Sequence, residues 1–205
     1  MRSIAYLASR CLVPSLLVFA ACSDDKPSGG NENEVITTVA LAFAPSGGGA
    51  TVSAAFNDPD GDGGTAPTID PIALAAGKTY TLTVQFQNKL ETPPEEITDE
   101  VRDESDAHQL FFTGTAVNGP ATSTTNAPLT QVYADTDAKG LPVGLSNTIT
   151  TTAGTGQLTV TLRHMPPVNG AAAKVADLAG KVKAGGLQAL PGDTDAQVTF
   201  AVTVQ

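Results

Sequence analysis

Cysteine is almost absent from this chain, and the positions of the few cysteines limit what they can do. Only Cys11 and Cys22 occur among 205 residues. Cys11 lies in a segment that we expect to be removed, and we expect Cys22 to carry a lipid. The remaining chain then has no thiol for a disulfide, a cysteine-based metal site or thiol catalysis. A hydrophobic core must therefore stabilise the fold.

Positive charge and histidine are also scarce. The chain has 11 basic against 21 acidic residues, a formal net charge of -10, and only two histidines and no tryptophan. Such a surface repels nucleic acid, so the charge excludes nucleic-acid binding and favours cations or basic partners. Neither histidine lies in a nucleophile motif such as G-x-S-x-G. The sequence therefore predicts that the protein is not an enzyme.

The single extended apolar run lies at the amino terminus. Residues 1–21 carry Arg2 and Arg10, then "CLVPSLLVFAA", and Cys22 follows. A basic segment before a short apolar run is typical of a secretory signal peptide, and the run is too short for a transmembrane helix. The ending "FAAC" resembles a bacterial lipobox, which predicts lipidation of Cys22. An ordinary signal peptide cleaved near Ala20 or Ala21 is the alternative.

Residues 22–33, "CSDDKPSGGNEN", are polar and contain glycine and proline. This composition predicts a flexible tether between the lipid and a folded domain at 34–205. Two or three acyl chains, at about 0.8 kcal/mol per buried methylene, would hold the protein permanently on a membrane. "SDDK" resembles the export tag of surface lipoproteins in Bacteroidota, and a plain hydrated linker is the alternative. We expect an outer-membrane lipoprotein on the periplasmic or the exposed side.

Alternating apolar and polar residues predict an all-β domain. The clearest segment is "KTYTLTVQFQN" (78–88), in which Tyr80, Leu82, Val84 and Phe86 alternate with Thr and Gln. The same period of two occurs in 34–43, 156–165 and 196–205, and more weakly in 50–57, 68–75, 107–117, 129–135 and 145–152. One wet face per strand favours antiparallel sheets. We therefore expect an Ig-like β-sandwich of about nine strands.

Two segments favour short helices between strands. In residues 91–104, prolines precede a stretch that turns Ile97 and Val101 inward. In residues 171–184, one helical face carries Val175, Leu178, Ala179 and Val182. Gly180 weakens this second helix by about 1 kcal/mol.

Three pairs of segments match in the same order along the chain. "FNDPDGDG" (56–63) matches "YADTDAKG" (133–140), "YTLTVQF" (80–86) aligns with "LTVTLRH" (158–164), and "DAHQLFF" (106–112) resembles "DAQVTFA" (195–201). These matches predict two related halves, 35–117 and 122–205, with pseudo-twofold character inside one sandwich. Chance similarity between threonine-rich strands is the alternative.

The order of "EVITTV", "DPDGDGGTAP", "LETPPEEITDE", "DAHQLFF", "DTDAKGLPVGL" and "GQLTVTLRH" resembles a family. It looks like small Bacteroidota envelope lipoproteins often labelled "type 1 periplasmic binding fold superfamily protein". The resemblance implies a TonB-dependent receptor as a partner. The fold in that label alternates strands and helices in two lobes and needs a longer chain. Here strand follows strand, so we expect the sandwich.

The Asp-x-Asp loops are candidate cation sites. Asp58, Asp60 and Asp62 reproduce the first half of an EF-hand calcium loop, but the bidentate Glu of its last position is missing. The second loop offers only Asp135 and Asp137, with Lys139 nearby. Asp and Gly are also the usual residues of tight turns. We interpret the first loop as an acidic turn first and a calcium site second.

An acidic run and the two histidines complete the candidate sites. The run is expected to be a solvated face or a surface that docks a basic partner; its candidate residues are Glu95, Glu96, Asp99, Glu100, Asp103 and Glu104. His108 follows this run, and His164 shares the parity of the core residues in its strand. With nearby carboxylates the histidines would suit a metal, and a hydrogen-bonded structural role is the alternative.

Together these features predict a lipid-anchored, non-enzymatic binding or accessory module of the cell envelope. Its ligand would be a small molecule or a cation such as calcium, and its partners the membrane and a TonB-dependent receptor. A structural or adhesive surface lipoprotein without a small ligand is the alternative.

Overall fold

The computed structural model describes residues 34–61 and 63–205. The signal segment 1–21, the tether 22–33 with Cys22, and Asp62 lie outside the described residues. Within the described part of the chain, no helix is both long enough and apolar enough to span a membrane. The described residues form an all-β domain, in which helical structure is limited to two short α-helices and one 3-10 turn.

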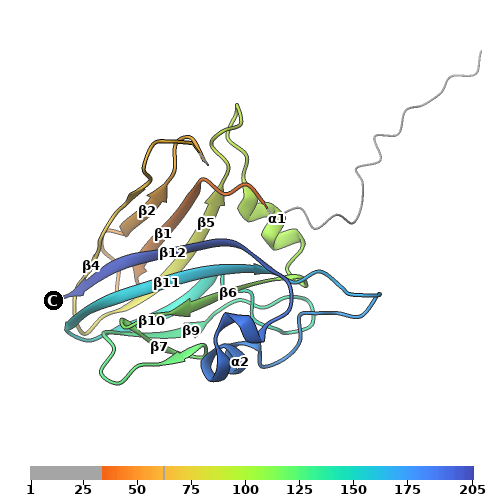
Figure 1. Cartoon of the computed structure of the whole chain (residues 1–205). Helices are drawn as coiled ribbons and strands as arrows, with labels where there is room; N and C mark the ends of the chain where they lie inside the picture. Colours follow the sequence, from red (N-terminus) through yellow and green to blue (C-terminus); the bar gives the residue numbers. More distant parts are fainter. Residues whose placement is uncertain (1–33, 62) are drawn as a thin grey trace, which may run out of the picture. The chain divides into compact units, whose positions relative to one another are not determined.

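Twelve strands form two sheets (Figure 1). The larger sheet has the order β3-β2-β1-β5-β10-β9-β7-β8, and the smaller has the order β4-β12-β11-β6. The strands are β1 Thr38–Pro45, β2 Val52–Asn57, β3 Thr68–Ile69, β4 Ile72–Leu74, β5 Thr79–Gln87, β6 His108–Thr113, β7 Val117–Gly119, β8 Thr122–Ser123, β9 Leu129–Tyr133, β10 Ser146–Thr151, β11 Gly154–His164 and β12 Asp193–Val204. The helices are α1 Ile97–Asp103, α2 Leu178–Gly185 and the 3-10 turn η1 Leu187–Ala189.

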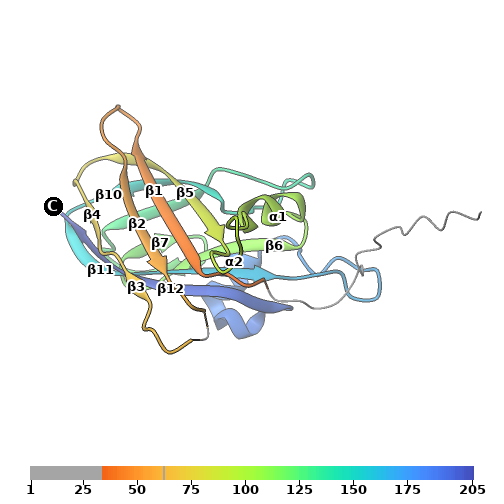
Figure 2. The same ribbon diagram turned by 90° about the horizontal axis from the view of Figure 1, so that it is seen from above.

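Strict alternation of burial places the core between the sheets. In β5 every second residue is buried and the others face solvent, as the sequence predicts. The inward residues of β5 and β1 pack against those of β11 and β12 in one cluster that includes Phe43, Phe86, Leu162 and Phe200. Figure 2 shows β1, β2 and β5 crossing over β11 and β12. The predicted all-β sandwich is confirmed.

A smaller core lies beneath α2. Phe111 of β6 and Met165 pack with the buried face of α2, formed by Leu178, Ala179 and Val182. The prediction that Val175 shares this helical face is wrong, because Val175 precedes the helix and is 41% exposed. The backbone of Asp177 is left-handed, at φ 63°, so the helix begins only at Leu178. Helix α1 is shorter than predicted and buries Ile97 and Val101 as expected.

The predicted strand 68–75 is wrong as a single element. It divides into β3, at the edge of the larger sheet, and β4, which pairs in parallel with β12 of the smaller sheet. Pro71 lies between them and has no N–H to continue a ladder. The chain therefore leaves one sheet there and enters the other.

The order of strands does not support the predicted internal repeat. Strand β5 lies in the larger sheet, whereas β11, its predicted counterpart, lies in the smaller one. Strands β2 and β9, which carry the two matched loops, lie in the same sheet, as do β6 and β12. A pseudo-twofold axis would have to treat every matched pair of strands in the same way, and these pairs do not behave alike. The strand order therefore does not relate the halves 35–117 and 122–205 by such an axis. The aligned strands 80–86 and 158–164 share an alternation of polar with apolar residues, whereas the match of 56–63 with 133–140 lies mostly in the acidic turns that follow β2 and β9.

Candidate functional site

Two histidines meet at one end of the four-stranded sheet. His108 is the first residue of β6 and His164 is the last of β11, and the two residues are paired across these antiparallel strands. Residues paired in this way project to the same side of a sheet. Their rings are stacked, with centroids 4.5 Å apart and planes within 8° of parallel. The two histidines, whose distance the sequence could not predict, are therefore in contact.

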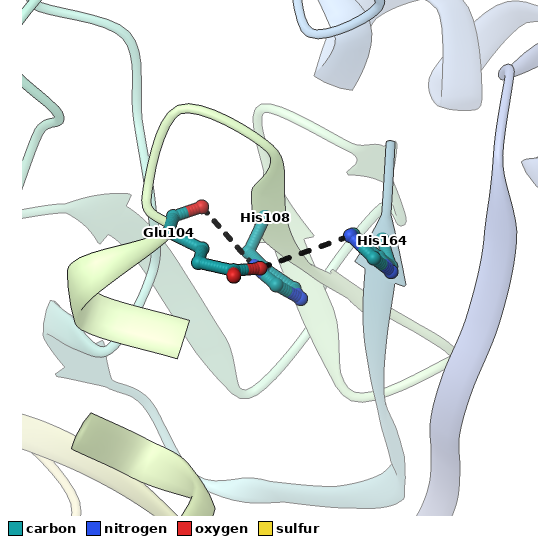
Figure 3. A group of neighbouring side chains, drawn as sticks. All are labelled: Glu104, His108 and His164. Atoms are coloured by element: carbon teal, nitrogen blue, oxygen red, sulfur yellow. Dashed lines mark hydrogen bonds and ion pairs between the residues drawn. The ribbon is translucent and has the colours of Figure 1, made fainter. Parts of the chain in front are cut away.

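Glu104 joins the histidines from the end of α1 (Figure 3). Its backbone carbonyl lies 3.1 Å from His108 Nδ1, and its carboxylate Oε2 lies 4.0 Å from His164 Nε2. One nitrogen of each ring and one carboxylate oxygen lie within 4.8 Å of one another. The Glu104 side chain is 53% exposed, whereas His108 is buried. The group is thus open to solvent on the side of Glu104.

Asp195 approaches the same histidines from β12. Its Oδ2 lies 3.7 Å from His108 Nε2, and neither side chain of this pair is more than 1% exposed. Both Asp195 oxygens and His108 Nε2 are buried and have no hydrogen-bond partner among the described residues. Buried polar atoms without partners are rare, since each costs about 1–3 kcal/mol. We call Glu104, His108, His164 and Asp195 the histidine cluster.

A β-bulge explains how Asp195 becomes buried. Leu162 pairs with Ala196 and Arg163 with Thr194, so Asp195 has no partner in the ladder. Further along β12, Gln197 and Thr199 are exposed, and regular alternation would expose Asp195 as well. A bulge turns the side chain of the extra residue away from the regular pattern. Just before β12, a side chain at Gly192 would place its Cβ 2.0 Å from the carbonyl oxygen of His164, so only glycine fits this turn.

Burial shifts the protonation of the cluster. It lowers the pKa of His108 to about 4, so this imidazole is neutral at neutral pH. Burial raises the pKa of Asp195 to about 6, although the nearby His164 and Arg163 partly oppose the shift. Above pH 6 the cluster therefore contains a neutral imidazole beside a buried carboxylate that carries its charge without a hydrogen bond.

Further carboxylates make the surroundings strongly negative. Burial raises the pKa of Glu34 to about 7, and the charges of Glu100, Asp195, Glu95 and Glu104 raise it further. Glu95, Glu100 and Glu104 belong to the acidic run and Asp195 belongs to β12. The acidic run and β12 therefore both lie near Glu34. An electronegative region of this kind raises the local concentration of cations.

The cluster has the donor types of a transition-metal site. Imidazole suits Zn²⁺, Ni²⁺, Cu²⁺ and iron, whereas Ca²⁺ takes almost only oxygen. A neutral imidazole also offers the lone pair that a metal needs. This lone pair lies in the plane of the ring, so two parallel rings cannot both point at one ion. One ring must turn when a metal binds.

The first predicted calcium loop forms a turn. The Asp60 carbonyl accepts the Gly63 N–H at 3.1 Å, and its Oδ2 accepts the Thr65 N–H, also at 3.1 Å. Hydrogen bonds from Thr65 are the largest cause that lowers the pKa of Asp60. The acidic-turn interpretation therefore accounts for Asp60. Calcium binding by Asp58 and Asp60 stays a prediction, and Asp62 lies outside the described residues.

The carboxylates of the second predicted calcium loop already have partners, and calcium binding by Asp135 and Asp137 stays a prediction. Asp135 accepts the N–H groups of Gly144 and Ser146, one on each oxygen. Asp137 Oδ1 accepts the N–H groups of Lys139 and Leu141, both at 2.9 Å. The remaining oxygen of Asp137 lies 2.9 Å from the ammonium of a lysine, Lys174. The loop is held by these bonds and offers no free carboxylate to a cation.

Lys174 is the charged core residue that sequence reasoning missed. Its ammonium donates to the Ser105 carbonyl at 2.7 Å and pairs with Asp137, and both side chains of the pair are at most 1% exposed. Burial lowers the pKa of Lys174, and the Asp137 charge opposes this shift. The pair links the β9–β10 loop to the segment before α2.

The acidic run is mostly exposed, as a solvated face requires. Glu95, Glu96, Asp99, Asp103 and Glu104 are exposed and Glu100 is half-buried. Three of them have local partners: Gln87 donates to Glu96, Asn88 donates to Glu95, and Arg102 pairs with Asp99 one turn earlier. Only Glu104 also contributes to the histidine cluster. The others stay a predicted docking surface.

A cleft of about 460 Å³ is lined by residues of β5, α1 and the β9–β10 loop. Its lining includes Thr83, Val84, Arg102, Asp135 and Leu145. Arg102 and Asp135 are engaged in the bonds described above, so the cleft offers a ligand mainly apolar, hydroxyl and amide groups. The histidine cluster, which contains unsatisfied buried groups, is the stronger candidate.

Comparison of the chain with models of protein families, with curated proteins and with solved structures gives no match. The chemistry of the histidine cluster is therefore the basis for a functional assignment.

Proposed function

We propose that the protein is a lipid-anchored binding module of the bacterial cell envelope, and that its folded domain binds a divalent transition-metal cation at Glu104, His108 and His164. One observation carries this assignment: His108 Nε2 and the Asp195 carboxylate face each other, buried, with no hydrogen bond among the described residues. A cation bound to His108 Nε2 would satisfy this nitrogen and place a positive charge beside the Asp195 carboxylate. The anchor is the predicted lipid on Cys22.

Stability against heat is a direct measure of such binding. We expect Zn²⁺ or Ni²⁺ to raise the melting temperature of the mature chain, made with Cys22→Ser to prevent lipidation. A cation at 100 times its Kd adds about 2.7 kcal/mol. For a domain of this size that corresponds to a rise of about 5–10 °C. His164→Ala should abolish the rise, and Glu104→Gln should reduce it.

Glu96→Gln is the matched control, because it removes an exposed carboxylate of the same acidic run and should leave the rise intact. Retention of the full rise by His164→Ala would contradict the proposed site.

A calcium arm of the same experiment tests the first Asp loop. A rise with millimolar Ca²⁺ that Asp58→Ala and Asp60→Ala remove would establish calcium binding there.

We further propose that the exposed acidic run serves as an accessory surface for a TonB-dependent receptor. Support comes from the exposure of Glu95, Asp99 and Asp103 and from the resemblance to Bacteroidota envelope lipoproteins. The tagged lipoprotein, purified from native membranes, should recover such a receptor. Asp99→Lys combined with Asp103→Lys should reduce the recovery. Absence of any receptor at endogenous expression would contradict this role.

A further inference from the structure

We infer that Asp195 is the fourth ligand of the cation site, which makes the histidine cluster a closed, tetrahedral Zn²⁺-type centre of two imidazoles and two carboxylates. This inference rests on the proposed cation binding and adds the coordination of the metal and the use of the site. Three observations support it: the hydrogen bond of His108 Nδ1, the bulge that buries Asp195, and the net charge of the ligands together with the cation.

The hydrogen bonding of His108 leaves Nε2 free to bind a metal. Nδ1 faces the Glu104 carbonyl at 3.1 Å, and a carbonyl only accepts, so Nδ1 must carry the proton. Nε2 then holds the lone pair. Metal-binding histidines usually donate their other N–H to a carbonyl or carboxylate in this way, which fixes the tautomer and the ring. Glu104 thus serves twice, through its carbonyl and its carboxylate.

Asp195 lies close to the position that a shared metal would require. Bond lengths of about 2.0–2.1 Å place two tetrahedral ligands about 3.3 Å apart. His108 Nε2 and Asp195 Oδ2 are 3.7 Å apart, and His164 Nε2 and Glu104 Oε2 are 4.0 Å apart. Each histidine therefore already has one carboxylate oxygen near ligand distance. Coordination requires these two pairs to draw together and the ring of His164 to turn, since the ligand atoms of Glu104, His108 and His164 lie within 4.8 Å of one another and Asp195 lies outside that group.

A repulsive contact becomes favourable when a cation is present. The lone pair of a neutral imidazole gains nothing from facing a carboxylate oxygen, whereas a cation bound between the two atoms would attract both. Arg163 is near, but its guanidinium donates to Thr194 Oγ1 and to the carbonyl oxygens of Leu190 and Pro191. Two imidazoles bound through their lone pairs, two carboxylates and one divalent cation would form a group with no net charge, which suits the buried side of the cluster.

Two structural consequences follow. The ring of His164, which is more exposed than that of His108, must rotate out of the parallel stack to aim its lone pair at the ion. Four protein ligands also leave no position for a reactive water. A closed site holds its metal, whereas catalytic zinc sites keep one position open. The centre is therefore suited to capture or storage of a metal and not to hydrolysis.

Cobalt substitution tests the fourth ligand. Co²⁺ bound tetrahedrally absorbs strongly in the visible range, and six-coordinate Co²⁺ absorbs weakly. We expect the Cys22→Ser mature chain to bind Co²⁺ with strong absorption, which Zn²⁺ displaces. Asp195→Asn should weaken Co²⁺ binding by more than the roughly 10–100-fold that loss of an outer partner costs. It should also change the spectrum of the residual complex.

Asp103→Asn is the control, because it removes one negative charge at the exposed end of α1 and should preserve both affinity and spectrum. If no metal binds the unaltered site, the proposed function itself fails. If Co²⁺ binds and Asp195→Asn matches the control, or if the absorption of the unaltered site is weak, the function stands and the fourth ligand is overturned. Circular dichroism of each variant confirms that it has folded.

Discussion

Lys174→Ala is expected to lower the free energy of unfolding by about 3–5 kcal/mol, the cost of removing one partner of a buried ion pair. The substitution leaves the Asp137 carboxylate without its ammonium and the Ser105 carbonyl without its donor. For a domain of this size the melting temperature should fall by about 6–20 °C. Urea denaturation followed by circular dichroism measures the change.

Lys139→Ala is the matched control. Lys139 Nζ lies 3.6 Å from Asp106 Oδ2, and both side chains are more than half exposed, so this pair should contribute less than about 1 kcal/mol. The double variant Lys174→Met with Asp137→Asn should regain part of the loss, since it removes both buried charges and keeps an oxygen for the Lys139 and Leu141 N–H groups. Equal losses for Lys174→Ala and Lys139→Ala would show that the buried pair is not a major support of the fold.

Asp195→Asn is expected to act in the opposite direction and stabilise the metal-free protein at pH 8 by about 1–3 kcal/mol. Burial raises the pKa of Asp195 to about 6, from an ordinary value near 3.9. The folded chain therefore holds this proton more tightly than the unfolded chain does. Stability from this group is present below about pH 4 and is lost as the pH rises to about 6. The variant has no such loss.

The gain from Asp195→Asn should therefore be small at pH 4 and complete above pH 6, when measured with a chelator present. Asp135→Asn provides the contrast, because both of its carboxylate oxygens accept backbone N–H groups. It should lose stability under the same conditions, by about 1–3 kcal/mol, since one oxygen becomes an amide donor. A loss of stability in Asp195→Asn at pH 8 would show that this carboxylate has a favourable partner, contrary to its surroundings.

The strands could be predicted because their burial follows a local rule. Tyr80, Leu82, Val84 and Phe86 alternate with polar residues, and all four are buried. Any pattern with a period of two places its apolar members on one face, whatever the rest of the chain does. The same rule failed at residues 68–75, where Pro71 ends the ladder and the chain changes sheets.

The histidine cluster could be predicted only in part. The sequence indicated that His108 and His164 have neighbouring carboxylates as possible co-ligands, but their contact depends on pairing between strands 56 residues apart. Asp195 was missed because alternation placed it on the wet face, and only a bulge in the pairing with β11 turns it inward. No local pattern signals one skipped residue in a ladder.

Lys174 was missed for a different reason, which is the composition of its segment. A lysine in the glycine- and alanine-rich segment before α2 has the composition of a solvated residue, and lysines are almost never fully buried without a partner. That partner, Asp137, was assigned instead to a cation loop. A turn residue and a buried counter-ion have the same sequence signature, Asp next to small residues, and only the three-dimensional pairing separates them.

The position of β12 sets when the protein can acquire its structure during synthesis. Strand β12 follows the other described strands in sequence and lies between β4 and β11, so the smaller sheet cannot be completed before residues 193–204 have been synthesised. Contacts between residues far apart in sequence also form slowly. For a chain that we propose to be exported, such a delay keeps the polypeptide extended and able to be threaded through a translocation channel before its sheets close.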